Sequence, residues 1–379
     1  MPTVTPEAVQ AALATVQDPE IRRPITEVGM VKSVQIDAAG AVSVGVFLTV
    51  SSCPMQDTIV DRVRTAVAAV PGVTGVDVEL DVMSDEQRKA LREQLQGPSK
   101  DIPFNRPGNT TRIIAVASGK GGVGKSSLTA NLAVALAQRG LAVGILDADI
   151  YGHSIPRILG IEHYPTRVEG MIMPPSAHGV LAISMLMFKP GGVAQAVAYR
   201  GPMNHKLLQQ FLTDVYWGDL DFLLIDLPPG TGDMAMSLGQ LLPQSELLVL
   251  TTPQQAAADV AVRAGMMALH TKQRVAGVVE NMSGLACPHC GQPIDVFGAG
   301  GGSLVAQVLT KELGTDVPLL ARVPFDLRLR QGGDDGSPLV LAEPTASASE
   351  AVAEIAAQLA NKPRGLVGKS LGITPAARR

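Results

Sequence analysis

From Arg112 onward, short runs of apolar residues alternate with longer segments in which apolar positions recur at helical spacing. This alternation predicts strands that are each followed by a helix, as in a doubly wound, mostly parallel α/β sheet. A last amphipathic helix is expected to include residues 352–359. The expected strands are residues 112–118, 141–147, 180–187, 221–227, 246–252, 274–281 and 318–323.

The first part of the chain has a different pattern and predicts a small α+β domain over residues 1–95. Two alternating runs flank Ala39-Gly40 and predict a hairpin, while Thr5 and Ser84 stand where helix N-caps are favoured. The expected helices are 6–16, 55–70 and 84–95, and the expected strands are 31–36, 41–50 and 73–82. Beyond this domain we expect a linker over 96–110, a second domain over 111–362 and a flexible basic tail over 363–379.

Composition limits the kinds of protein that this chain can be. Its 379 residues suffice for two domains, and 46% hydrophobic with 17% charged residues is typical of a soluble globular protein. A net charge of −4 provides no basic surface for nucleic acid. No apolar run approaches the roughly 18 residues of a membrane span, and Gly and Pro in the tail oppose a basic membrane anchor. We therefore expect a cytoplasmic protein with neither nucleic-acid nor membrane partners.

Residues 119–126 form a complete phosphate-binding motif, G-x-x-x-x-G-K-[ST], between an expected strand and an expected helix. Its glycines allow backbone N–H groups to surround an anion. Lys125 is expected to reach the β- and γ-phosphates, and the Ser126 hydroxyl to bind Mg²⁺. A second lysine, Lys120, follows the first glycine and indicates a branch of nucleotide-binding proteins that work as dimers. The expected nucleotide-binding residues here are Gly119, Lys120, Gly121, Gly122, Val123, Gly124, Lys125, Ser126 and Ser127.

Three aspartates follow apolar strands, at the edge where parallel sheets bind their ligands. Asp147 and Asp149 end one strand; one is expected to orient or deprotonate a water molecule and the other to support Mg²⁺. A turn or helix-capping role is the alternative for Asp149. Asp226 is the expected second metal carboxylate of a P-loop NTPase. Asn281 ends a further strand, where a hydrogen bond to a nucleotide base and a plain turn are equally expected.

Cys287 and Cys290 form a C-x-x-C pair, and the third cysteine is Cys53, so no disulfide framework is expected. Two thiolates complete neither a tetrahedral zinc site nor a four-iron cluster, whereas a symmetric dimer supplies four. The pair alone leaves three interpretations: a thioredoxin-like redox pair, a zinc shared across a dimer with His289 as a further ligand, or an iron–sulfur cluster. Cys53 precedes a helix, which suits either a thiolate or a small buried hydrophobic residue.

Several of these segments resemble one group of P-loop ATPases. The deviant Walker A motif of the MinD/ParA/Mrp group is similar to residues 120–126. The Mrp/ApbC branch, whose members are iron–sulfur cluster carriers, has segments that resemble residues 147–156, 226–233, 280–283, 287–290 and 297–302. The resemblance covers about residues 110–362. Residues 1–95 resemble the small iron–sulfur-assembly domain that is often fused ahead of it.

The resemblance implies an ATPase with slow hydrolysis that works as a homodimer and delivers clusters to apoproteins. Lys120 would reach the nucleotide of the partner subunit, and Lys125 would bind its own. Asp149 would position the hydrolytic water, and Asp147 and Asp226 would serve the Mg²⁺ shell.

The resemblance also implies that Asn281 contacts adenine, and that Cys287 and Cys290 hold a [4Fe–4S] cluster bridging two subunits. His153 stands where the family usually has proline, and we expect no change in the chemistry. Two alternatives share the phosphate loop. A positioning or partitioning ATPase would leave the cysteine pair unused and needs a DNA-binding or membrane-binding face that the sequence does not show clearly. A regulatory ATPase bridged by zinc is distinguished by metal analysis.

Overall fold

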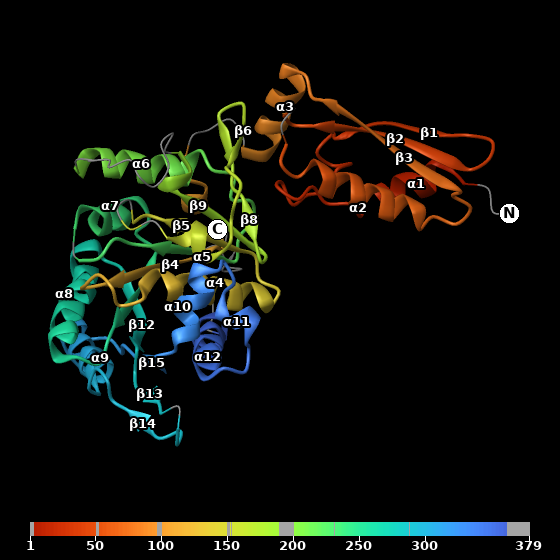
Figure 1. Ribbon diagram of the computed structural model, residues 1–379. Coiled ribbons are helices and arrows are strands. Elements are labelled where there is room, and N and C mark those ends of the chain that lie inside the picture. The colour runs from red at the N-terminus through yellow and green to blue at the C-terminus, as the bar shows by residue number, and fades with distance from the viewer. Residues whose placement is uncertain are drawn as a thin grey trace, which may run out of the picture. The chain divides into compact units, whose positions relative to one another are not determined.

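The computed structural model describes residues 4–50, 53–96, 101–149, 152, 154–188, 201–230, 232–287 and 289–361. They divide into two compact units (Figure 1). The first consists of Met1–Lys100 with two later segments, His163–Pro175 and Asp214–Gly218, and the second contains the rest of the chain. The expected tail over 363–379 and the substituted position His153 lie outside the described residues.

The first unit is built on a sheet of three strands, β1 (Val31–Ile36), β2 (Ala41–Leu48) and β3 (Gly75–Val82). The expected hairpin is confirmed, because β1 and β2 pair in antiparallel register. Gly40 in its turn has a φ of 84°, in the left-handed region that favours glycine. Strand β3 pairs in parallel with the other edge of β2. Alternate residues of β2 therefore point into one core, and Val42, Val44, Val46 and Leu48 are all buried.

Helices α1 (Pro6–Leu13), α2 (Gln56–Ala68) and α3 (Asp85–Gln96) cover this core. Both predicted N-caps are present: the Thr5 hydroxyl accepts a hydrogen bond from the Ala8 N–H at 3.3 Å. The Ser84 hydroxyl accepts from the Gln87 N–H, and the Gln87 side chain accepts from the Ser84 N–H at 2.8 Å, which is a capping box. Helices α1 and α2 end a few residues earlier than expected.

The two later segments complete the first unit, which the sequence did not predict. Strands β6 (Thr166–Val168) and β7 (Met171–Met173) form a short antiparallel hairpin. Backbone bonds join Ile172 to Asp214 and Tyr216. The hydrophobic side chains of both segments enter the same core as β2 and the helices, and the buried ones are Val168, Met171, Met173 and Tyr216.

The second unit contains a sheet of eight strands in the order β15-β12-β11-β4-β10-β5-β9-β8. Every pair in it is parallel except the edge pair β8–β9, so the predicted doubly wound, mostly parallel sheet is confirmed. The expected strand over 180–187 ends at Ser184 because the chain turns there into the 3₁₀ helix η2 (Met185–Phe188). The strands are β4 (Arg112–Ser118), β5 (Val143–Asp147), β8 (Ser176–Ala177), β9 (Val180–Ser184), β10 (Phe222–Asp226), β11 (Glu246–Thr251), β12 (Arg274–Asn281) and β15 (Leu319–Val323).

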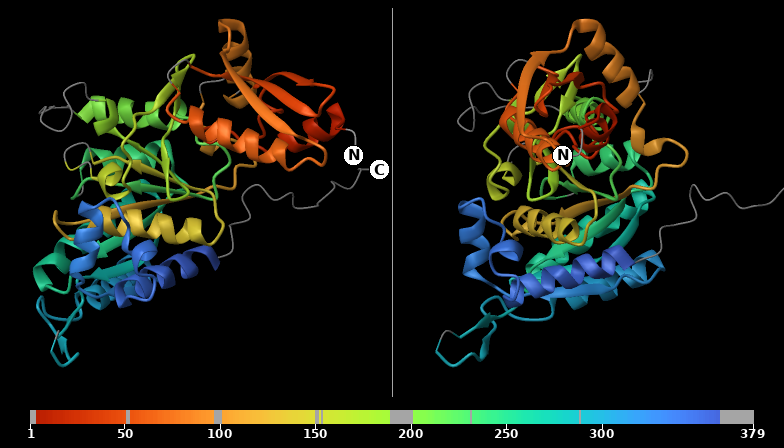
Figure 2. Two further views of the ribbon diagram at one scale, coloured as in Figure 1. Left: turned by 45° about the vertical axis from the view of Figure 1, so that its right-hand side comes forward. Right: turned by 90° about the vertical axis from the view of Figure 1, so that its right-hand side faces the viewer.

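Helices cover both faces of this sheet (Figures 1 and 2). Helices α4 (Lys125–Gln138) and α12 (Ser347–Asn361) lie side by side on one face, with the short helices α5 (Ile155–Ile158), α10 (Leu327–Asp334) and α11 (Leu339–Ala342) beside α4. Helices α8 (Gln255–Thr271) and α9 (Gly301–Leu313) cover the other face, followed outward from α8 by α7 (Asp233–Leu241) and α6 (Gly201–Thr213). Among the described residues, no helix has the length and apolar character that a membrane span requires.

Candidate functional site

The phosphate loop lies between β4 and α4, the strand–loop–helix context that the motif requires. Gly122 and Gly124 have φ values of 78° and 81°, so their left-handed backbone favours glycine. A side chain at Gly119 would place its Cβ 2.4 Å from the backbone carbon of Val260 in α8. The loop can therefore approach α8 only because this residue has no side chain.

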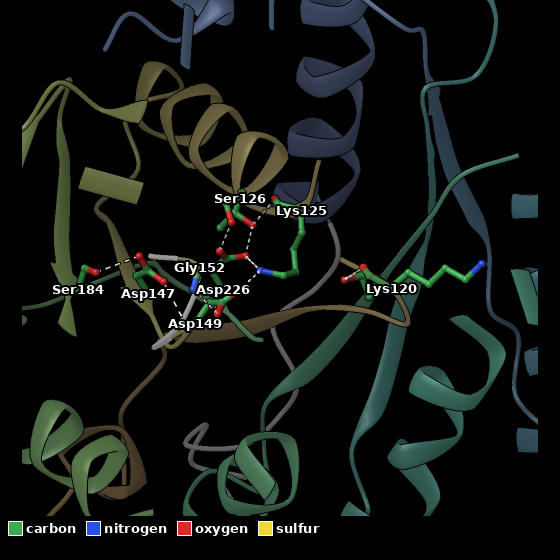
Figure 3. A network of polar contacts seen from close by, with 10 residues as sticks. Lys120, Lys125, Ser126, Asp147, Asp149, Gly152, Ser184 and Asp226 are labelled. Atoms are coloured by element: carbon green, nitrogen blue, oxygen red, sulfur yellow. Dashed lines mark hydrogen bonds and ion pairs between the residues drawn. The ribbon is translucent and has the colours of Figure 1, made fainter. Parts of the chain in front are cut away.

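One lysine and one aspartate form the centre of the site (Figure 3). Lys125 Nζ lies 2.7 Å from Asp226 Oδ1 and 3.9 Å from Asp149 Oδ2. The Ser126 hydroxyl donates a hydrogen bond to the other oxygen of Asp226 at 2.5 Å. Asp226 is fully buried, and Lys125 is only 7% exposed. The structure therefore brings the two residues expected to bind phosphate and Mg²⁺ onto the carboxylate expected to serve that metal.

Asp147 lies beside Asp226 because their strands, β5 and β10, pair in parallel with these residues in register. The Ser184 hydroxyl at the end of β9 donates to Asp147 at 3.0 Å, and the Asp149 N–H donates to it at 3.2 Å. Burial, and then the neighbouring Asp226, raise the pKa of Asp147 to about 8. Burial also raises the pKa of Asp226, against the attraction of Lys125. Two buried carboxylates thus share one ammonium group, and a further cation would relieve their repulsion.

Asp149 makes a local turn contact and also lines the cleft, so both roles considered for it remain predictions. Its carboxylate accepts a hydrogen bond from the N–H of Gly152, three residues further along the chain, at 2.8 Å. It also lines the cleft beside Lys125 (Figure 3). Sequence analysis missed Ser184, which ends β9, the strand that pairs with β5 in the sheet. A serine at the end of a buried strand next to an aspartate-ended strand is the signal that would have identified it.

The cleft over the phosphate loop has a volume of about 720 Å³ and is lined by the loop, Asp149 and the Pro228-Pro229 turn. A second cavity of about 450 Å³ continues from it past Gly122, Gly124 and Ser127. Asn281 lines this second cavity, together with a loop at 324–327, and its Nδ2 donates to the Val123 carbonyl at 2.8 Å. The polar cleft is suited to phosphates and the more apolar cavity to a nucleoside.

Lys120 behaves differently from Lys125. It is exposed, and its side chain extends away from the aspartates (Figure 3). Its carbonyl accepts a hydrogen bond from the Ser118 hydroxyl at 3.0 Å, so the backbone is fixed while the ammonium group is not part of the carboxylate cluster.

The cysteine pair lies at the tip of a hairpin formed by β13 (Leu285–Ala286) and β14 (Pro293–Ile294), which projects from the second unit (Figures 1 and 2). Cys287 is half-buried and Cys290 is exposed. Backbone N–H groups of His289 and Cys290, and the Cys290 side chain, lower the pKa of Cys287, which favours the metal-binding thiolate. Among the described residues, no group of three or more His, Cys, Asp or Glu is arranged to hold a metal.

Cys53 lies in the first unit and has the environment of a buried hydrophobic residue. It is 5% exposed, and its Sγ lies 3.9 Å from Glu20 Oε2. Burial, and then Glu20, raise the pKa of the Cys53 thiol to about 11. Of the two alternatives considered for Cys53, burial favours the small hydrophobic residue over a thiolate, because desolvation outweighs the effect of the N-terminus of α2.

The free energy of unfolding of the first unit is expected to fall as the pH rises from about 4.5 to about 7. Burial, and then Asp18, raise the pKa of Glu20 from 4.5 to about 7, so the folded state holds a proton that the unfolded chain releases in this range. The whole shift in the pKa of Glu20 corresponds to about 3 kcal/mol of free energy of unfolding. Glu20→Gln keeps an acceptor for the Thr166 hydroxyl and should reduce the change of the free energy of unfolding with pH. Urea unfolding followed by the fluorescence of Trp217, the single tryptophan and buried in this unit, measures the difference.

A Gln variant with the same pH dependence as the wild type would contradict this assignment. It would point to Asp18, whose pKa is also raised by burial.

Known proteins and two family models match most of the chain. The family model described as NUBPL iron-transfer P-loop NTPase matches residues 109–360, and that of an iron-sulfur cluster assembly protein matches residues 6–97. The iron-sulfur cluster carrier protein of Mycobacterium bovis is 56% identical over 373 residues, 98% of this chain and 97% of its own. The nucleotide-binding protein of Archaeoglobus fulgidus, solved in complex with ADP, is 34% identical over 70% of this chain and 96% of its own, with a TM-score of 0.52.

The septum site-determining protein MinD of Pyrococcus horikoshii, solved with Mg-ADP, is 26% identical over 69% of this chain and 100% of its own, with a TM-score of 0.50. The longer family match includes the phosphate loop, the three aspartates and the cysteine hairpin. The chain therefore belongs to the family of NUBPL-type iron-transfer P-loop NTPases, with an iron–sulfur-assembly domain ahead of the NTPase domain.

Proposed function

We propose that the protein is a homodimer that binds and slowly hydrolyses ATP, holds a [4Fe–4S] cluster and delivers it to apoproteins. The observation that carries the proposal is the cysteine pair, with Cys287 half-buried and Cys290 exposed. The pair lies on a hairpin that begins shortly after Asn281, a residue of the nucleotide cavity. The family and the name of the mycobacterial relative support an iron–sulfur cargo.

The donor set fits a nucleotide with Mg²⁺. Ser126 and Asp226 would hold the metal, since hard oxygen ligands suit it and these two side chains are already in contact. When bound, Mg²⁺ neutralises the phosphate charge. Lys125 exchanges its ion pair with Asp226 for the β- and γ-phosphates, and Asp147, held by Ser184, supports the metal shell. Asn281 binds the adenine edge in the second cavity.

Hydrolysis is assigned to Asp149 and Lys120. Asp149 lies at the cleft with its carboxylate fixed by Gly152, where it can orient a water molecule toward the terminal phosphate. Lys120 is exposed and extends away from its own carboxylates, as a residue that reaches the nucleotide of the partner subunit requires. A site completed by two chains makes hydrolysis slow in the monomer.

The cluster is cargo, and its ligands come from two chains. Each chain supplies two thiolates, and no third ligand accompanies them among the described residues, so two hairpins together satisfy a four-iron cluster. The exposed tip leaves the cluster accessible to a client apoprotein. All three cysteines are free, the state that a reducing compartment maintains, and we place the activity in the cytoplasm.

Anaerobic reconstitution with iron and sulfide tests the proposal. We expect Mössbauer spectra of a [4Fe–4S] cluster, with four irons per two chains when iron and protein are quantified on the same sample, and a dimer by light scattering. A preparation that takes up no cluster but retains zinc would contradict the proposal and favour the zinc-bridged regulatory ATPase.

A further inference from the structure

Glu280 is a buried glutamate at the end of strand β12 that the nucleotide chemistry does not use. Its side chain is 1% exposed. The Ser283 hydroxyl donates to Glu280 Oε1 at 2.6 Å, and the Gly302 N–H donates to Oε2 at 2.6 Å. Arg322 Nε lies 3.4 Å from Oε1, so one cation partly balances the charge. Both oxygens thus accept short, charge-assisted hydrogen bonds.

The two hydrogen-bond donors stand at the two ends of the segment that carries the cysteines. Ser283 precedes the hairpin of β13 and β14, and Gly302 follows it in the first turn of α9. A single carboxylate therefore joins the start and the end of the segment 283–302. The fit is close, because a Cβ at Gly302 would lie 2.6 Å from the Glu280 Cβ. The N-terminus of the 13-residue helix α9 further favours an anion here.

The next residue along the strand, Asn281, joins the end of β12 to the phosphate loop. Asn281 is 6% exposed, and its Nδ2 donates to the Val123 carbonyl. A Cβ at Gly124 would lie 2.4 Å from that nitrogen, so the loop and the amide are in close contact. Side chains of consecutive strand residues point to opposite faces. The end of β12 therefore contacts the nucleotide loop on one side and both ends of the cysteine segment on the other.

We infer that Glu280 is a positioning residue that couples nucleotide binding to the cysteine hairpin. The inference rests on the proposed function. When Asn281 engages a base, a displacement of the end of β12 moves both ends of the hairpin together, because Glu280 holds them. Without that bond, backbone rotation at Gly284, shortly after Met282, would absorb the displacement. Nucleotide occupancy thereby changes how the two cysteines present the cluster to an acceptor.

Glu280→Gln tests this role, because glutamine keeps the size and one acceptor oxygen but cannot accept from both donors. The readout is the rate at which a ferrous chelator removes iron from the reconstituted protein, with and without Mg-ATP. In the wild type we expect the rates of iron removal with and without Mg-ATP to differ by a ratio of about fivefold or more, the size of ordinary allosteric coupling. In the variant the ratio should fall below about twofold, while nucleotide affinity and iron content stay near the wild-type values.

Glu246→Gln is the matched control. Glu246 is a largely buried glutamate of the same sheet, paired with Arg112 at 2.7 Å at the opposite end of its strand. The Glu246→Gln variant is expected to keep the wild-type ratio of iron-removal rates even if the substitution lowers stability. An unchanged ratio in Glu280→Gln, or an equal loss in Glu246→Gln, would overturn the inference. A wild type that takes up no cluster would instead contradict the proposed function.

Hydrogen exchange of the wild type provides a measurement that does not depend on a variant or on cluster loading. Addition of Mg-ATP is expected to change the protection of backbone amides at both ends of the segment 283–302. Altered protection at the phosphate loop with none at these ends would overturn the inference.

Discussion

Replacing Cys287 with alanine is expected to abolish retention of the cluster while the affinity for nucleotide stays close to that of the wild type. A dimer of this variant offers two thiolates instead of four, and two thiolates do not hold a four-iron cluster. Cys287 lies on the projecting hairpin and lines neither the phosphate cleft nor the nucleoside cavity. Iron and sulfide per chain after anaerobic reconstitution, and nucleotide titration by calorimetry, measure the two properties separately.

Cys53→Ala is the matched control for this experiment. Cys53 lies in the first unit, is buried, and has a thiol whose pKa is raised to about 11, so it does not supply a thiolate. This variant should therefore take up as much iron as the wild type. Equal losses of iron in both variants would argue against the hairpin as the ligand site. Equal losses of iron and nucleotide affinity in Cys287→Ala would assign the pair a structural role.

Features that depend on neighbouring residues were predicted from the sequence. The apolar strands of the second unit form continuous runs because both faces of a parallel sheet are buried. The caps Thr5 and Ser84 act within one helical turn, and the phosphate loop is one contiguous segment. Each of these signals is contained in a few consecutive residues, so no knowledge of the rest of the fold was needed.

Features that depend on partners distant in the chain were not predicted. The hairpin of β6 and β7 is short, and its buried residues Met171 and Met173 pack on a core made by the first residues of the chain. The sequence around β6 and β7 gives no sign of that core. By contrast, Asp147 and Asp226 were expected at one edge of the sheet because each ends a strand, and they lie side by side. The role of Ser184 could be recognised only from the order of the strands in the sheet. The role of Glu280 could be recognised only from its hydrogen bond to Gly302.

Replacing Lys125 with alanine is expected to weaken nucleotide binding by about 10- to 150-fold, the effect of removing a hydrogen bond to a charged group. Nucleotide-dependent transfer of the cluster should then be lost, although the cysteine hairpin is intact and still loads. The change also leaves Asp226 buried without the ammonium group 2.7 Å away. Breaking such a buried pair costs on the order of 3 to 5 kcal/mol, so a thermal unfolding curve must accompany the binding measurement.

Lys120→Ala distinguishes the two lysines of the loop. Lys120 is exposed and extends away from the three aspartates, so its removal should leave stability and nucleotide affinity almost unchanged. Hydrolysis should nevertheless fall, because the residue completes the site of the partner subunit. A Lys125→Ala protein that still transfers its cluster in response to ATP would contradict the coupling of nucleotide binding to cluster transfer. Normal ATP hydrolysis by a Lys120→Ala protein would show that Lys120 is not part of the site. The role of Lys125 would be unaffected, because of the two lysines it is Lys125 that contacts the buried Asp226.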